Sequence, residues 1–87
     1  MELPGQDLVE RGVADLRRGE ETVEALLVSV GARRLTAVGV DVPARFPSAE
    51  IRLYEVLRHE HGDDAHGRYN ALLRRLVNFE RAAECAS

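Results

Sequence analysis

Three histidines, His59, His61 and His66, lie close together in the chain beside Asp63 and Asp64. Imidazole and carboxylate groups are common metal ligands, so this segment is a candidate metal site. Its spacing argues against one, because ligands on one helix face stand three or four residues apart and His59 and His61 are two apart. A polar helix end explains the same residues, since histidine is favoured at a helix C-terminus and aspartate at the next N-terminus. We therefore expect neither a metal nor another cofactor.

Arg52 and His59 share a face of one predicted helix, with six residues between them. This spacing resembles the short signature of the HEPN ribonuclease domains, which are also helical. The resemblance covers two residues, and those domains are usually longer than this chain. It implies that Arg52 and His59 bind and cleave RNA at a dimer interface. The competing interpretation is two exposed polar residues on an amphipathic helix.

A helix, a glycine and a second helix occur in succession around Gly31, which is the order of a helix-turn-helix motif. Arg33 and Arg34 would then open the recognition helix over residues 32–38 and contact nucleic acid. Three features oppose this interpretation. Leu27 is bulky at a position where such motifs usually need a small residue. The second helix is short, and the chain carries a net charge of −3, whereas nucleic-acid binders usually have a basic excess. A buried helical hairpin is the alternative.

Signals for catalysis by a nucleophile are weak, and we predict that the protein is not an enzyme. Cys85 is the only cysteine, so no internal disulfide or cysteine-based metal site is expected, and a reducing compartment is the simplest setting. Ser48 is better explained as a helix N-cap. Three arginine pairs, at positions 17–18, 33–34 and 74–75, fit either an anionic partner or simple solvation of helix surfaces. All twelve basic residues are arginine, which suggests a GC-rich bacterial genome.

Hydrophobic periodicity predicts the elements that must position these residues. Apolar residues recur at helical spacing, and glycines at 19, 31, 39 and 62 separate the segments. Thr22 is the predicted N-cap of the second helix, and Gly39–Val40 has the pattern of a Schellman ending. On the fourth helix, Ile51 and Tyr54 are placed with Leu57 on the buried face. The helices are expected over residues 6–18, 23–30, 32–38, 49–61 and 65–83.

The length of 87 residues and the composition predict one domain, residues 1–87, with an all-α fold: a compact bundle of four to five helices with a long C-terminal helix. No long apolar run is present, and we expect a cytoplasmic protein. The predicted core consists of six aliphatic residues: Leu26, Leu27, Val30, Leu57, Leu72 and Leu76.

The fifth helix has the most regular apolar pattern in the chain. Its heptad stripe is widened on one side by Leu73 and Val77, and a domain this small has few helices to cover both surfaces. We therefore predict a protein–protein interaction module, either a homodimer or a partner for another protein such as an accessory subunit or an antitoxin-like regulator. The predicted interface comprises five residues: Tyr69, Leu73, Leu76, Val77 and Phe79.

Overall fold

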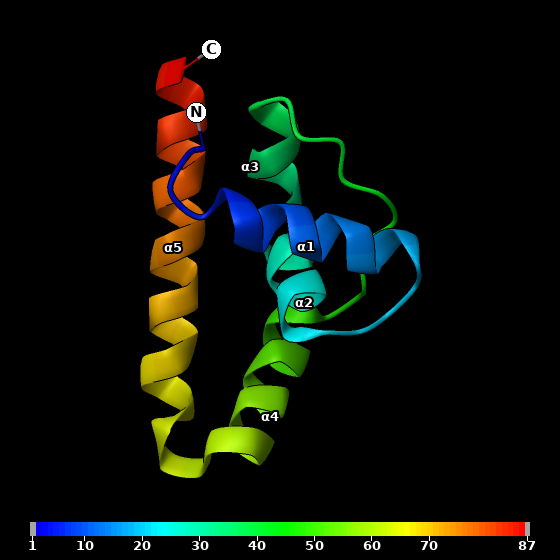
Figure 1. Ribbon diagram of the computed structural model, residues 1–87. Coiled ribbons are helices and arrows are strands. Elements are labelled where there is room, and N and C mark those ends of the chain that lie inside the picture. Colours follow the sequence, from blue (N-terminus) through cyan, green and yellow to red (C-terminus); the bar gives the residue numbers. More distant parts are fainter. Residues whose placement is uncertain (1, 87) are drawn as a thin grey trace.

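The computed structural model describes residues 2–86 and contains five α-helices and one 3-10 turn, with no strand in that range (Figure 1). The all-α prediction is confirmed. The elements in chain order are α1 (Gln6–Arg17), α2 (Val23–Val30), α3 (Ala32–Ala37), α4 (Ala49–His61), the turn η1 (Gly62–Asp64) and α5 (Ala65–Ala86).

Helix α1 crosses α2 at close range, and a glycine makes the crossing possible (Figure 1). Gly12 is buried in α1 against the backbone carbonyl of Glu24 and the side chain of Val28. A Cβ atom at this position would overlap both groups. The glycine that weakens α1 as a helix is therefore what lets α2 approach it.

The predicted helix ends are confirmed where glycine or threonine sets them. Gly39 has φ 95°, and the N–H groups of Gly39 and Val40 donate to the carbonyls of Thr36 and Leu35 at 3.1 and 3.0 Å. This is the double hydrogen bond of a Schellman motif. The Thr22 hydroxyl accepts a hydrogen bond from the Ala25 N–H at 3.1 Å, so Thr22 caps α2 as predicted.

The core is centred on α2, which contacts α1, α3, α4 and α5. Leu26 and Leu27 are fully buried, and Leu57 and Leu76 are 3% exposed, as predicted. Two predicted core residues, Val30 and Leu72, are only partly buried and pack against the edge of the cluster. Both lie at the boundary of hollows in the surface, where no further helix covers them.

The prediction that Ile51 and Tyr54 lie on the buried face of α4 is wrong. Ile51 and Tyr54 are 64% and 36% exposed, whereas Ala49, Leu53 and Leu57, spaced four apart, form the stripe that packs on α2 and α5. Ile51 lies about 160° around the helix from Leu53, so one packed face cannot hold both.

Ser48 does not cap α4 with its side chain, which corrects the prediction. Its backbone is left-handed (φ 52°), whereas an N-cap residue is normally extended, and no side-chain cap bond is formed. Helix α4 is followed by η1, and α5 then continues to Ala86, three residues beyond its predicted end.

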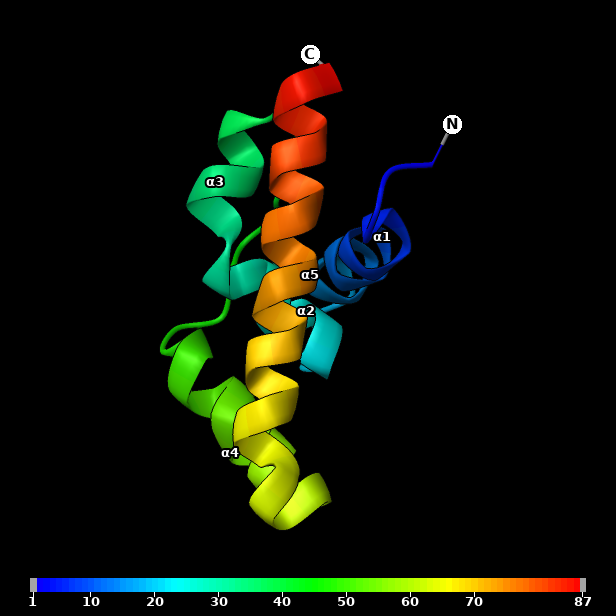
Figure 2. The same cartoon turned by 90° about the vertical axis from the view of Figure 1, so that its left-hand side faces the viewer.

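Helices α4 and α5 form a hairpin, joined at the bottom of both ribbon views (Figures 1 and 2). With 22 residues, α5 is about 33 Å long and runs along most of the 38 Å long axis. None of the helices in the described residues is long and apolar enough to span a membrane.

Candidate functional site

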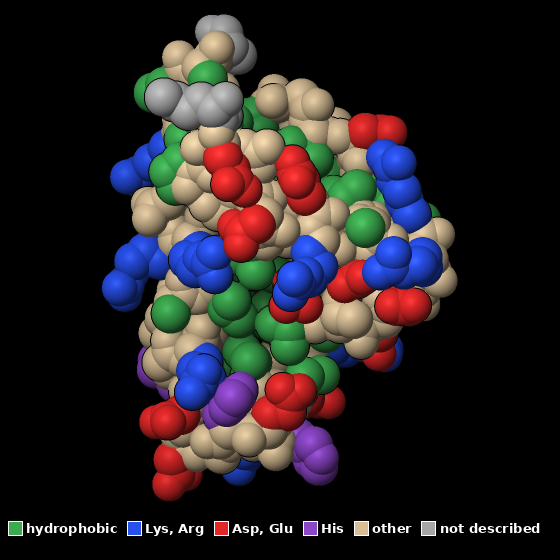
Figure 3. All heavy atoms as spheres, in the orientation of Figure 1, with side chains coloured by type: hydrophobic (Ala, Val, Ile, Leu, Met, Phe, Trp, Pro, Cys, Tyr) green, Lys and Arg blue, Asp and Glu red, His purple; other side chains and the backbone are tan. Residues whose placement is uncertain are grey.

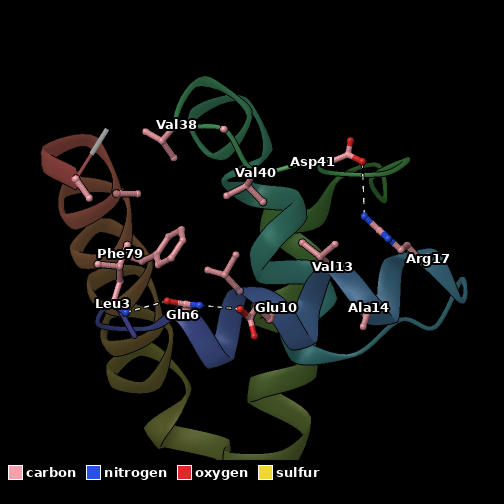
Figure 4. A pocket seen from close by; sticks show the side chains of 14 residues that line it. Leu3, Gln6, Glu10, Val13, Ala14, Arg17, Val38, Val40, Asp41 and Phe79 are labelled. Carbon is pink, nitrogen blue, oxygen red and sulfur yellow. Dashed lines mark hydrogen bonds and ion pairs between the residues drawn. The ribbon is translucent and has the colours of Figure 1, made fainter. Parts of the chain in front are cut away.

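The most apolar hollow, here called the α1 groove, has a volume of about 630 Å³. It lies between α1, the end of α3 and the C-terminal part of α5 (Figure 4). Its walls include Val13 from α1, Val38 and Val40 from the α3 end, and Phe79 from α5. These aliphatic and aromatic groups are contributed by three elements, so the groove is a product of the tertiary fold.

Polar groups in the α1 groove lie along α1 and at its far end, and they bond to each other. The Gln6 amide donates to Glu10 at 2.8 Å, and Arg17 forms an ion pair with Asp41 at 3.6 Å. Among residues 2–86, no histidine, cysteine, serine or threonine lines the groove. Its chemistry suits binding of an apolar group, because no side chain there is a usual nucleophile.

A second hollow, of about 340 Å³, opens on the face shown in Figure 3, where charged side chains surround a narrow strip of apolar groups. Val23, Leu57 and Leu72 supply its apolar lining. Four charged residues from three helices also line it: Glu24, Glu60, Arg68 and Arg75. His61 is also part of the lining, whereas His59 lines a different hollow.

Arg52 and His59 line one hollow, as their spacing on the helix predicts, together with Glu21, Glu55 and Glu60. Arg52 is held by Glu21 through two hydrogen bonds, one from Nε and one from Nη2, the latter at 2.5 Å. These bonds lower the pKa of Glu21 and raise that of Arg52. An RNA phosphate would have to displace Glu21 in a hollow that carries three carboxylates.

The histidine segment forms the end of the α4–α5 hairpin. His59 and His66 are exposed, and the His66 ring lies 3.2 Å from the Asn70 amide nitrogen. Within residues 2–86, no group of three histidine, cysteine or acidic side chains is arranged to hold a metal ion.

The two arginines predicted to open a recognition helix have different surroundings. Arg34 lies 4.0 Å from the buried Glu80 of α5. Arg33 lines a hollow of about 500 Å³ together with Thr36 and Arg45, here called the arginine hollow. Arg45 was not among the predicted site residues. The excess of arginine over acid in residues 25–49 is visible in the sequence and could have identified it.

Two carboxylates are buried, and the sequence did not single out either. Asp15 accepts hydrogen bonds from Arg18 at 2.5 Å and from the Thr22 hydroxyl at 2.6 Å. Glu80 has one oxygen near Arg34, while its Oε2 has no hydrogen-bond partner among the residues that the structure describes. Burial raises the pKa of Glu80, and the charge of Arg34 partly opposes that shift.

The five predicted interface residues fall into two groups. Leu76 and Phe79 are core residues, 3% and 6% exposed, and are already covered by the domain. Tyr69, Leu73 and Val77 are partly exposed. Tyr69 contacts Tyr54 of α4 edge to face, with ring centroids 5.8 Å apart. Together with the exposed side chains of α4 they form what we call the α4–α5 face: Ile51, Tyr54, Tyr69, Leu73 and Val77.

The chain matches no protein-family profile, no curated protein and no solved structure.

Proposed function

We propose that this protein is a protein-interaction module that self-associates through the α4–α5 face. One observation carries the proposal: Ile51 and Tyr54 are the large hydrophobic side chains that the domain leaves exposed within residues 2–86. The Tyr54–Tyr69 contact joins them to Leu73 and Val77, which follow Tyr69 at four-residue intervals on α5. Exposed apolar side chains grouped in this way commonly mark an interface.

Charge supports a second copy of the chain as the partner. Glu50 and Glu55 flank the apolar side chains of α4, and Glu50 is near enough to Tyr69 to contribute to the raised pKa of that tyrosine. On α5, Arg74 is next to Leu73 in sequence. We propose a two-fold dimer in which α4 of one protomer faces α5 of its partner, so that Glu50 and Glu55 lie toward the partner's Arg74 at two symmetric places.

Sedimentation of the purified chain and of Ile51→Glu tests the proposal. The wild type is expected as a species of twice the 9.7 kDa chain mass at micromolar concentration. Ile51→Glu should raise the dimer dissociation constant by about tenfold or more, since the dimer contains two such carboxylates at an apolar contact. Ile51 is 64% exposed, so the variant should keep the helical circular dichroism spectrum.

Ala71→Glu is the matched control, because it adds the same charge at an exposed position on α5 that lines the second hollow, about 160° around the helix from Tyr69 and Leu73. It should leave the dimer unchanged. A wild-type chain that sediments as a monomer, or an equal effect of Ile51→Glu and Ala71→Glu, contradicts the proposal. The single cysteine suits the reducing cytoplasm, which we propose as the location.

A further inference from the structure

The arginine hollow differs in charge from the rest of this acidic protein. Residues 25–49 contain Arg33, Arg34 and Arg45 but only one acidic residue, Asp41, in a chain whose net charge is −3. Asp41 is paired with Arg17 on the side of the α1 groove. The hollow therefore lies in a locally positive region, and none of the described residues that line it carries a carboxylate.

Both arginines that line the hollow are available to a ligand. Arg33 and Arg45 are exposed and form no ion pair or hydrogen bond with any part of the chain that the structure describes. Arg34, the next residue after Arg33, differs from these two arginines because it lies beside the Glu80 carboxylate. Thr36 is exposed one helical turn after Arg33, so its hydroxyl is on the same side of α3.

The loop that carries Arg45 is attached to the core next to that residue. The backbone N–H of Phe46 donates to the Ser29 hydroxyl at 3.2 Å, and Ser29 in turn donates to the Ala25 carbonyl at 2.9 Å. Phe46 is partly buried against the core. Pro43 and Pro47 restrict the backbone on both sides of Arg45. Arg45 is thus held in a defined position, in one hollow with Arg33 and Thr36 of α3.

We propose that the arginine hollow binds the phosphate group of a small phosphorylated molecule. Arg33 and Arg45 supply planar guanidinium groups, which match two phosphate oxygens better than an ammonium does, and Thr36 supplies a hydroxyl donor. The volume of about 500 Å³ is that of a small-molecule site. Two arginines in an acidic protein suit one phosphate group or pyrophosphate better than a long nucleic acid, which needs an extended basic surface.

Calorimetric titration with pyrophosphate at physiological ionic strength tests the proposal, with amide NMR shifts to locate the site. Saturable binding is expected, with shifts centred on Arg33, Thr36 and Arg45. Arg33→Gln or Arg45→Gln should each weaken binding by about tenfold or more, because each removes a charge-assisted contact. Arg58→Gln is the control: Arg58 is an exposed arginine that does not line the hollow, and its loss should change affinity little.

Either of two results with pyrophosphate would overturn the proposal. One is the absence of saturation by pyrophosphate at millimolar concentration in the correctly folded wild type. The other is binding that Arg58→Gln weakens as much as Arg33→Gln, which indicates general attraction of anions. Tighter binding to a duplex DNA oligomer than to pyrophosphate, with both control and hollow variants weakened, would assign the region to nucleic acid instead. Melting curves of each variant separate loss of binding from loss of folding.

Discussion

Two regions each combine a glycine with a buried carboxylate but differ in what surrounds them. One is the α1–α2 crossing, and the other is the α3–α5 junction, where Gly31 and Arg34 lie beside Leu76 and Glu80. At the crossing, Gly12 faces the backbone of α2, and Asp15 accepts hydrogen bonds from two donors. At the junction, Gly31 faces the side chain of Leu76, and Glu80 keeps an unpartnered oxygen. The first region is tightly constrained on every side, whereas the second retains room to adjust.

Gly12→Ala should have the largest effect on stability. The new Cβ would overlap the Glu24 carbonyl oxygen and Val28 Cγ2, and backbone cannot move aside without separating the two helices. A loss of about 3 kcal/mol or more in the free energy of unfolding is expected, measured by urea denaturation.

Gly31→Ala is the matched comparison for that change. Its Cβ would approach Leu76 Cδ2 to 2.7 Å, but this atom is the end of a flexible side chain. The cost should be about 1 kcal/mol. Equal losses for Gly12→Ala and Gly31→Ala would remove the distinction between a rigid crossing and an adaptable junction.

Asp15→Ala should have an intermediate effect, destabilising the protein by about 2 kcal/mol through loss of the bonds from Arg18 and Thr22. Thr22 keeps its cap bond to Ala25, so α2 itself should persist in the circular dichroism spectrum. Asp15→Asn retains an acceptor oxygen and should cost less. An unchanged urea midpoint for Asp15→Ala would mean that this carboxylate does not stabilise the turn.

Glu80→Gln should have the smallest effect on the free energy of unfolding. It should stabilise the protein, whereas the three substitutions above destabilise it. Burial raises the pKa of Glu80, so the folded state binds this proton more tightly than the unfolded chain does. That contribution to stability is present below the ordinary glutamate value of 4.5 and is lost as pH rises through the higher folded pKa. At neutral pH the variant should therefore be more stable than the wild type, as measured by urea denaturation.

The pH dependence supplies the check on that prediction. The stability difference between Glu80→Gln and the wild type should grow as pH is raised from 4.5 toward neutrality and then level off. A difference that shrinks over the same interval would show that Arg34 stabilises the Glu80 carboxylate by more than burial costs it.

The helices could be predicted from the sequence because their ends carry local signals. Thr22 and Gly39 act through their nearest neighbours in the chain, so their roles are independent of tertiary packing. The orientation of α4 could not be predicted in the same way. Ile51–Tyr54 and Ala49–Leu53–Leu57 are both apolar series at helical spacing, and only the positions of α2 and α5 select the second.

The candidate sites likewise divide into those set by local spacing in the sequence and those set by tertiary packing. Arg52 and His59 share a hollow because helix spacing alone brings them together. The arginine hollow was missed because Arg33 and Arg45 are joined by the course of the connector, which the Ser29–Phe46 hydrogen bond fixes. The burial of Glu80 likewise depends on α3 lying beside α5.

The α1 groove has a practical consequence for handling the protein. Leu3 and Ala86 both line it, so the two ends of the described chain are close together, on the side of the molecule opposite the α4–η1–α5 turn (Figure 1). An affinity tag or a surface tether at either end would crowd the α1 groove. A surface tether would also orient the hairpin turn away from the support. Immobilisation by the C-terminus therefore suits assays of the α4–α5 face. It does not suit screening for ligands of the α1 groove.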